Sequence, residues 1–310
     1  MRTVTLDALS DDAGVAPGAV CTLGVFDGVH RGHRRLLERL VRAARERERE
    51  AVVLTFAVHP VVVVRNLTPR LITSLPHRLR LFEPLGVDAC VVLPFDESVR
   101  GLSAEAFART VFLDGLAAGG LVLGPDTRIG RDRAGDLEFL GAFCDRHGLT
   151  FEVVDPVVDD GGPVSSTRIR AAITDGDLER ASRMLGRPFT LFGTVVRGEE
   201  RGRKLGYRTA NLDLHHEIRP PAGVYAIRAR VDVASRGGVL NIGIRPTFGP
   251  DGDLTVEAHL FDYDGDLYGR ELEVELVDRL REEMRFESRE ELARQIERDC
   301  RAARERLGGG

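Results

Sequence analysis

The sequence predicts an α/β protein with two domains. Between residues 20 and 160, continuous apolar runs of strand length alternate with segments of helical periodicity, which is the pattern of a parallel sheet covered by helices. After residue 189, short strand-like runs follow one another with no helix between them until the last helix of the chain. We therefore expect an N-terminal Rossmann-like domain at 1–186 and, at 187–310, a small antiparallel β-barrel with a closing helix.

Five apolar runs are predicted to be the parallel strands of the first domain: 20–25, 51–56, 89–93, 121–123 and 150–154. They are continuous rather than alternating, as expected of strands that are buried on both faces. Helices are predicted at 33–50, in a segment ending at Gly86, at 104–116 after a Ser103 cap, and at 136–147 before Gly148. In such a sheet the ligand lies at the carboxyl ends of the strands.

The second domain is predicted from short β-rich runs separated by turn residues, at 189–196, 223–230, 239–244, 255–261 and 272–276. Five or six strands of this kind favour a small antiparallel barrel. One helix closes the chain. Ser288 and Glu291 form a capping box at its start, and one apolar stripe runs along it: Leu292, Ile296, Cys300, Ala303 and Leu307. The change of pattern near 186–188 marks the expected domain boundary.

Composition limits the class of protein. The chain is 43% hydrophobic and 30% charged with a formal net charge of -5, which predicts an ordinary globular protein and argues against a general nucleic-acid surface. No apolar run approaches the roughly 18–20 residues of a membrane span. The four cysteines are scattered and form no Cys-x-x-Cys pair, so we expect reduced thiols and a cytoplasmic location. Neither nucleic acid nor membrane is expected as a partner.

The stretch after the first predicted strand carries the clearest functional signal. Gly24, Gly28 and Gly32 lie in a turn that leads directly into an amphipathic helix. The N-terminus of such a helix presents unpaired N–H groups and the positive end of the helix dipole, which attract phosphate. His30 and His33 are three residues apart, so both imidazoles can point at one phosphate. The alternative is that the two histidines only cap a solvated turn.

A hydroxyl-rich turn later in the first domain is a second candidate. Ser165, Ser166 and Thr167 precede Arg168 and Arg170 at the start of a helix-like segment. Arginine suits bidentate contact with phosphate, so this turn could clamp a leaving pyrophosphate. The alternative is a plain N-cap.

Two further candidates follow predicted strands. His59 comes after the second strand, and a loop with Asp126 and Arg128 comes after the fourth. Because the carboxyl ends of parallel strands share one edge of a sheet, His59 is expected to face the same crevice as His30 and His33. His59 taken alone is more often structural.

The second domain offers a basic loop, two neutral oxygen ligands and a carboxylate. The glycine-rich loop 197–206 follows a strand and is either a phosphate cradle or a mobile hairpin loop. Thr209 and Asn211 supply a hydroxyl and an amide oxygen, which suit a Mg²⁺ ion that already carries phosphates. Glu257 lies in a β-rich run and is a general base for a hydroxyl if it faces a crevice, or an ordinary strand carboxylate if it faces water.

Taken in order along the chain, these pieces resemble the bacterial bifunctional riboflavin kinase/FAD synthetase (FMN adenylyltransferase) family. The resemblance covers nearly the whole chain. In the first half it rests on the motifs at 24–33 (Gly-Val-Phe-Asp-Gly-Val-His-Arg-Gly-His), 55–60, 93–103, 124–130 and 165–170. In the second half it rests on those at 202–211, 223–226, 241–248, 256–257 and 266–269.

The resemblance implies two reactions. The C-terminal, riboflavin kinase-like domain would phosphorylate riboflavin to FMN with ATP and Mg²⁺. The N-terminal nucleotidyltransferase domain would transfer adenylate from a second ATP to FMN, giving FAD and pyrophosphate. The expected partners are therefore riboflavin, FMN and ATP, with no tightly bound redox cofactor. The implied catalytic residues are His30, His33 and Glu257, and the implied metal ligands are Thr209 and Asn211.

The resemblance also implies a set of nucleotide- and phosphate-binding residues in each domain. In the first domain they are Gly24, Phe26, Asp27, Gly28, His59, Asp126, Arg128, Ser165, Ser166, Thr167 and Arg168. In the second domain they are Gly198, Gly202, Arg203, Lys204 and Gly206. Histidines, a helix N-terminus and arginines suit a step that needs charge stabilisation rather than a covalent nucleophile.

Four residues depart from the family pattern. Val58 replaces the first proline of Thr-Phe-x-Pro-His-Pro, Thr127 and Ile129 replace the phenylalanines of Phe-x-Phe-Gly, and Arg208 replaces the proline of Pro-Thr-Ala-Asn. The loss of two aromatic side chains removes stacking surface. Two alternatives follow. One is a divergent paralogue with a working kinase, whose first domain takes a modified flavin or another nucleotide, and the other is a non-enzymatic flavin or nucleotide sensor.

Overall fold

A computed structural model describes residues 1–9, 13–197, 207–215, 217–231, 234–245 and 253–308. The chain forms two compact units, Met1–Arg168 and Ile169–Gly310. Each unit has its own sheet and its own apolar core. None of the helices in the described part of the chain combines the length and the hydropathy that crossing a membrane requires.

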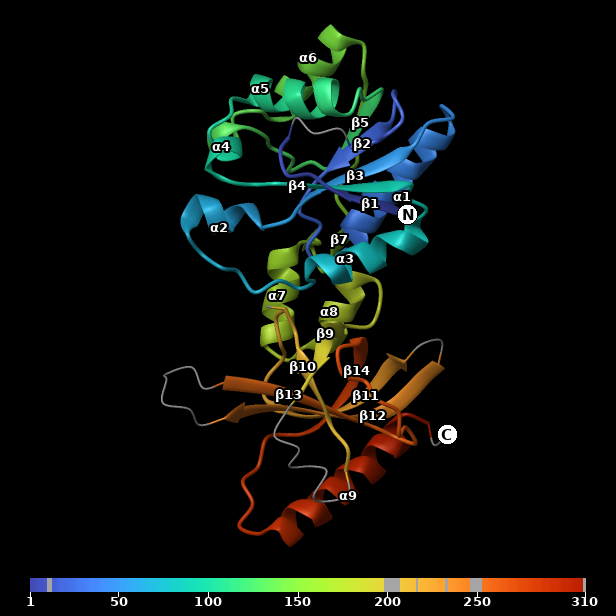
Figure 1. Ribbon diagram of the computed structural model, residues 1–310, viewed down its shortest axis with the longest axis vertical. Coiled ribbons are helices and arrows are strands. Elements are labelled where there is room, and N and C mark those ends of the chain that lie inside the picture. Colours follow the sequence, from blue (N-terminus) through green and yellow to red (C-terminus); the bar gives the residue numbers. More distant parts are fainter. Residues whose placement is uncertain (10–12, 198–206, 216, 232–233, 246–252, 309–310) are drawn as a thin grey trace. The chain divides into compact units, whose positions relative to one another are not determined.

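The first unit is built on a six-stranded parallel sheet with the strand order β1-β4-β3-β2-β5-β6 (Figure 1). The strands are β1 (Arg2–Thr5), β2 (Val20–Leu23), β3 (Ala51–Phe56), β4 (Ala89–Leu93), β5 (Gly120–Leu123) and β6 (Thr150–Val153). The five predicted strands are confirmed as β2 to β6. The apolar pattern does not predict β1, because its four residues are mostly exposed. The strand order reverses at β2, which has β3 on one side and β5 on the other, and ligand sites of such sheets lie at this point.

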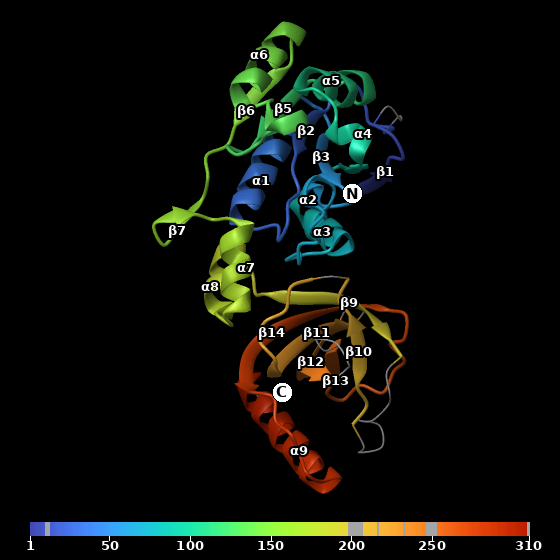
Figure 2. The same ribbon diagram turned by 90° about the vertical axis from the view of Figure 1, so that its left-hand side faces the viewer.

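Helices cover both faces of this sheet (Figures 1 and 2). The helices of this unit are α1 (Arg31–Arg45), α2 (Pro60–Arg65), α3 (Leu75–Phe82), α4 (Glu97–Arg100), α5 (Ala104–Ala108) and α6 (Leu137–His147). There are also 3₁₀ turns at Glu83–Leu85 and Arg131–Arg133, and a π-helical turn at Arg109–Gly115. A hairpin of β7 (Val158–Asp159) and β8 (Gly162–Pro163) follows the sheet, and α7 (Ser166–Thr174) begins at the end of this unit. One apolar core packs under α5 and α6 and another under α1 and α3, because successive strand residues face opposite sides of the sheet. The predicted α/β architecture is confirmed.

Helix boundaries follow the predicted signals with two differences. Ser103 caps α5, and Gly148 ends α6 in the left-handed region, both as predicted. The predicted helix that begins with α5 continues to Gly115 as a π-helical turn. The first helix ends at Arg45 and not at residue 50, since Glu48 takes a φ of 52° that is incompatible with a continuing helix.

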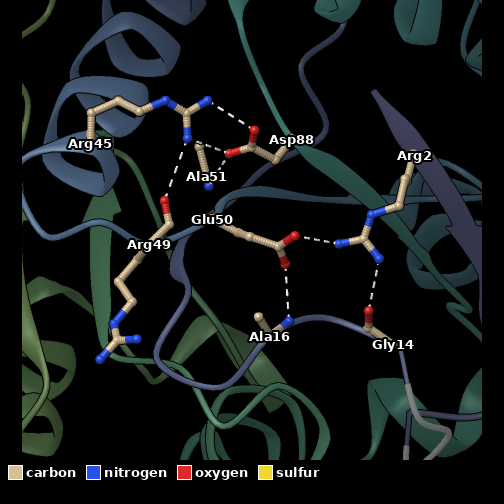
Figure 3. Close-up of polar contacts among 8 residues, drawn as sticks. All are labelled: Arg2, Gly14, Ala16, Arg45, Arg49, Glu50, Ala51 and Asp88. Carbon is tan, nitrogen blue, oxygen red and sulfur yellow. Dashed lines mark hydrogen bonds and ion pairs between the residues drawn. The ribbon is translucent and has the colours of Figure 1, made fainter.

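Charged side chains tie the amino ends of the strands together (Figure 3). Arg2, at the start of β1, pairs with Glu50 at 2.6 Å, and Glu50 also accepts a hydrogen bond at 3.0 Å from the segment that precedes β2. Arg45 forms a bidentate pair with Asp88 at 2.7 and 2.8 Å, and Asp88 also accepts the backbone N–H of Ala51 at 2.8 Å. We call Arg2, Glu50, Arg45 and Asp88 the amino-edge clamp. It lies at the opposite edge of the sheet from the glycine turn.

The second unit is a closed antiparallel barrel with the order β10-β13-β12-β11-β14-β9. Its strands are β9 (Thr190–Val196), β10 (Ala210–Asp213), β11 (Gly223–Val231), β12 (Ala234–Arg245), β13 (Asp253–Leu260) and β14 (Glu271–Arg281), with α8 (Leu178–Leu185) before them and α9 (Arg289–Arg306) after them (Figure 2). The predicted barrel with a closing helix is confirmed, and β10 is a strand that the sequence pattern does not predict. Arg281 of β14 holds α9 through an ion pair with Asp299 at 2.8 Å.

Candidate active sites

The turn after β2 is strained. Phe26, Gly28 and Val29 have φ angles of 54°, 86° and 41°, and a positive φ is costly for phenylalanine and valine. Asp27, which is 3% exposed, holds the turn from inside by accepting the backbone N–H of Thr73 at 3.0 Å. Gly28 donates its own N–H to the Thr73 hydroxyl at 2.8 Å. Backbone strain that surrounding contacts maintain in this way is typical of functional turns.

His30 and His33 lie at the N-terminus of α1 with their rings stacked, 3.6 Å between centroids and 16° between planes. His30 is the N-cap, since its Nδ1 accepts the backbone N–H of His33 at 3.3 Å. A ring nitrogen that accepts carries no proton, so neutral His30 has its proton on Nε2. Phe26 packs edge-on against His33 at 5.2 Å. Capping therefore uses Nδ1 of His30, and Nε2 is the nitrogen of this ring that can donate a hydrogen bond.

The electrostatics of this pair favour a neutral His33. Burial lowers the pKa of His33 well below its ordinary value, and the positive charges of a protonated His30 and of Arg78 lower it further. An anionic phosphate against the ring has the opposite effect, because a nearby negative charge favours the imidazolium. A bound phosphate therefore favours protonation of His33, and the protonated ring interacts more strongly with that phosphate.

The hydroxyl-rich turn packs onto the glycine turn although the two are far apart in sequence. Ser166 donates its hydroxyl hydrogen to the backbone carbonyl of Asp27, 139 residues away, at 2.8 Å. Ser165 accepts the backbone N–H of Arg168 at 3.4 Å, and Thr167 is exposed. The guanidinium of Arg168 donates to three backbone carbonyls of the β7–β8 hairpin at 2.8, 2.9 and 2.9 Å. Arg168 thus fixes the hairpin beside the start of α7.

The other predicted residues of the first unit lie at neighbouring strand ends. His59 follows β3 and caps α2 as His30 caps α1, with Nδ1 accepting a helix N–H at 3.2 Å. Asp126 and Arg128 are exposed in the loop after β5. Ile129, in contrast, is 4% exposed and belongs to the apolar core, so its side chain offers no stacking surface to a ligand.

In the barrel, strand register places Glu257 of β13 directly opposite Asn211 of β10 and Asn241 of β12. Residues opposite each other on neighbouring strands share one face of the sheet. Val256 and Ala258 are buried, so the half-exposed Glu257 lies on the outer face of the barrel between two amides. The sequence motifs identify Glu257 and Asn211 but assign no role to the Asn241 side chain. The alternation of successive side chains between the two faces of its strand is the sequence signal that would place the Asn241 side chain on the same face as Glu257.

Two donors at the start of β10 suit a magnesium ion. Thr209 and Asn211 offer a hydroxyl and an amide oxygen, and Mg²⁺ prefers oxygen ligands while keeping water and phosphate oxygens as its remaining ones. Within the described ranges, no group of three or more His, Cys, Asp or Glu side chains has the arrangement of a self-contained metal site. A metal at Thr209 and Asn211 would therefore depend on ligands from a nucleotide.

A cavity of about 210 Å³ opens beside Thr209. It is lined by Val195, Arg208, Thr209, Ala210, Ala258, Leu260, Tyr263, Asp264, Gly265, Asp266, Leu267 and Tyr268. Arg208 donates to the backbone carbonyl of Asp264 at 2.9 Å, which ties the loop after β13 to the start of β10. Apolar and aromatic walls with a few polar groups are typical of small-ligand pockets.

The predicted residues thus fall into two groups. One gathers at the carboxyl edge of the parallel sheet, and the other at Glu257 and the neighbouring cavity of the barrel. The basic loop of the second domain lies outside the described residues, so the roles expected for Gly198, Gly202, Arg203, Lys204 and Gly206 stay predictions.

Known proteins match both parts of the chain. The FAD synthetase family model matches residues 13–168, and the riboflavin kinase family model matches residues 185–307. A bifunctional riboflavin kinase/FMN adenylyltransferase of Pseudomonas fluorescens is 40% identical, over 93% of this chain and 92% of that protein. The protein of the same description from Escherichia coli K12 is 38% identical, over 94% of this chain and 93% of its own. A crystal structure described as a macrolide-efflux protein from Streptococcus pneumoniae is 32% identical with a TM-score of 0.83, covering 96% of this chain and 97% of that one.

Proposed function

The chain belongs to the bifunctional riboflavin kinase/FMN adenylyltransferase family, and we propose that its two activities use the two candidate sites, one in each domain. As a member of this family it phosphorylates riboflavin to FMN and adenylylates FMN to FAD in flavin cofactor biosynthesis. We assign the adenylyltransferase to 1–186 and the kinase to 187–310, and the family matches at 13–168 and 185–307 support this division. These relatives support neither an altered nucleotidyltransferase substrate nor a sensor without activity.

Adenylyl transfer is assigned to the glycine turn and the N-terminus of α1. A phosphate oxygen of FMN attacks the α-phosphorus of ATP, the bond to the bridging oxygen of the β-phosphate breaks, and pyrophosphate leaves. This displacement needs alignment and charge stabilisation more than a covalent nucleophile. In this assignment His30 and His33 donate to phosphate oxygens beside the helix N-terminus. The hydrogen bond from Ser166 to Asp27 carries this assignment, because it joins the two phosphate-binding segments.

The remaining residues of the first domain shape that site. Gly24, Phe26, Asp27 and Gly28 form the turn, Ser165, Ser166, Thr167 and Arg168 flank the pyrophosphate side, and His59, Asp126 and Arg128 lie at neighbouring strand ends. Because Arg168 already donates to the β7–β8 hairpin, its role is to place this segment as well as to supply charge.

Phosphoryl transfer is assigned to the outer face of the barrel. Glu257 takes the proton of the 5′-hydroxyl of riboflavin, whose oxygen attacks the γ-phosphorus of ATP, and ADP leaves. Thr209 and Asn211 would hold Mg²⁺, which supplies positive charge to the phosphates. The cavity beside Thr209 fits the nucleoside end of ATP, since two tyrosines line it. The register that sets Glu257 between Asn211 and Asn241 carries this assignment.

We also propose that ATP with Mg²⁺ serves both reactions and that the protein acts in the cytoplasm. Its four cysteines, Cys21, Cys90, Cys144 and Cys300, are free thiols, and the first three are buried. Burial raises the pKa of Cys21 to about 12, so this thiol is unreactive at neutral pH. Free, buried thiols are typical of a reducing compartment.

Paired variants of the full chain test the two-site assignment. Glu257→Gln should lower FMN formation from riboflavin about 100-fold or more and leave FAD formation from added FMN within about twofold of wild type. His33→Ala should lower FAD formation from added FMN about 100-fold or more and leave FMN formation from riboflavin within about twofold of wild type. Glu275→Gln on β14 and His147→Ala on α6 are matched controls that should change neither rate. Loss of both activities in either site variant, with the protein folded, would contradict the assignment.

A further inference from the structure

Arg78 is a buried arginine that no sequence motif singles out. It lies in α3 and is 3% exposed. Its Nη1 donates to the backbone carbonyl of Val25 and, at 3.1 Å, to the hydroxyl of Thr55. Thr55 donates to the same carbonyl at 3.3 Å. Burying a guanidinium is costly, and these hydrogen bonds to a backbone carbonyl and a hydroxyl are contacts that an apolar side chain could not make.

Both acceptors lie at the carboxyl edge of the sheet. Val25 follows β2 and leads into the glycine turn, and Thr55 is the penultimate residue of β3. The guanidinium therefore joins the ends of two adjacent strands where the turn begins. One turn further along α3, Phe82 packs edge-on against Phe26 at 5.6 Å, and that ring packs against His33 at 5.2 Å. The helix α3 thus supports the turn through a polar and an apolar contact.

We propose that Arg78 is a positioning residue of the adenylyl-transfer site, whose guanidinium sets the path of the chain into the glycine turn and whose charge acts on bound phosphates through the His30 and His33 pair. The proposal rests on the assignment of adenylyl transfer to that pair. Arg78 does not need to touch the substrate, because fixing Val25 fixes the start of the segment that carries both histidines. A buried charge is screened little by solvent, so its field reaches the neighbouring imidazole.

The effect of this charge is measurable at His33. Burial is the largest cause of its lowered pKa, the charge of a protonated His30 is the second, and the charge of Arg78 is the third. Removing the charge at position 78 should therefore raise the pKa of His33, whereas lysine at that position should keep it low. Glutamine keeps a hydrogen-bond donor and loses the charge. The two substitutions thus separate charge from hydrogen bonding.

Full-length Arg78→Lys and Arg78→Gln test the proposal, with Arg80→Gln on the exposed side of α3 as the matched control. The measurements are kcat and KM of FAD formation from FMN and ATP, the pKa of His33 by NMR titration, FMN formation from riboflavin, and thermal unfolding. Arg78→Gln should lower kcat of FAD formation about 10- to 100-fold and raise the pKa of His33, while Arg78→Lys stays within about fivefold with that pKa unchanged. FMN formation should be unchanged in all three variants.

Wild-type FAD rates and an unchanged pKa of His33 in a folded Arg78→Gln protein would overturn the proposal. If Arg78→Gln does not fold, Arg78→Lys decides alone: near-wild-type activity supports the role of the charge, and a folded protein with less than about a tenth of the wild-type kcat overturns it. His33→Ala distinguishes a failure of the site assignment from a failure of the Arg78 proposal. If that variant makes FAD normally, the site assignment fails, whereas an inactive His33→Ala beside fully active Arg78 variants removes only Arg78.

Discussion

A histidine that caps a helix through Nδ1 is also a fixed donor through Nε2. His30 and His59 both accept a helix N–H with Nδ1, at 3.3 and 3.2 Å. The cap decides which nitrogen carries the proton and holds the ring in one direction. Capping and phosphate binding, which the sequence presents as alternatives for His30, are therefore compatible in one side chain.

Sequence spacing singles out candidate site residues but does not predict which of them meet. The His-x-Gly-His spacing and the Ser-Ser-Thr-Arg turn identify His30, His33 and Ser166, but the hydrogen bond from Ser166 to Asp27 spans 139 positions and follows only from the fold. Arg78 is missed for a physical reason. An arginine in a helix is ordinarily solvated, and only tertiary packing buries this one.

Arg208, which replaces the proline of the family pattern, provides a prediction for the kinase site. Its guanidinium donates to the Asp264 carbonyl and its own carbonyl contacts the His259 ring at 2.8 Å. Arg208→Ala should loosen the loop that lines the cavity and raise the KM for ATP of riboflavin phosphorylation about threefold with kcat nearly unchanged, the effect of one exposed hydrogen bond. Initial rates at varied ATP measure it. Arg230→Ala on β11 is the control, and a fall in kcat at constant KM would contradict this role.

Among the elements, continuous apolar runs predict strands reliably where both faces are buried. The strands β2 to β5 are buried throughout and match the predicted runs. β10 (Ala210–Asp213) escapes the pattern because it is short and its outer face carries Asn211 and Asp213. Asn211 is one of the residues that we assign to the kinase site, and its polarity is also the reason that a hydrophobic pattern does not detect this strand.

The amino-edge clamp stabilises the sheet at the edge away from the adenylyl-transfer site. The hydrogen bonds from Arg45 are the main cause that lowers the pKa of Asp88 below its ordinary value. A carboxyl group whose pKa is lower in the folded than in the unfolded state contributes stability above the unfolded pKa of about 4. That contribution is lost as the pH falls through the lowered pKa of the folded state.

Asp88→Asn should therefore lower the free energy of unfolding by about 1 kcal/mol at pH 7 and by less at pH 3. Denaturant unfolding at both pH values measures the difference, and Asp114→Asn, at an exposed position, is the control. FAD and FMN formation at pH 7 should stay at wild-type rates, because the clamp lies at the opposite edge from the site. An equal loss of stability at both pH values would show that the ion pair with Arg45 is not its source.

At the scale of the whole molecule, the proposed assignment gives each reaction its own set of residues. The FAD synthetase match ends at residue 168 and the riboflavin kinase match begins at residue 185, so no residue is shared between them. Glu257 and the histidine pair belong to different compact units. FMN, the product of one reaction and the substrate of the other, links the two activities chemically.

Two singly inactivated full chains test whether FMN passes through solvent. His33→Ala should make FMN and no FAD, and Glu257→Gln should make FAD only from supplied FMN, so neither variant alone converts riboflavin to FAD. An equimolar mixture should restore that conversion after a lag, because FMN released by one chain must accumulate before the other binds it. Chromatographic time courses measure the lag, which added FMN should abolish, and the double variant is the control. If His33→Ala forms FMN but keeps it bound, so that the mixture makes no FAD from riboflavin, FMN is handed over only within one chain.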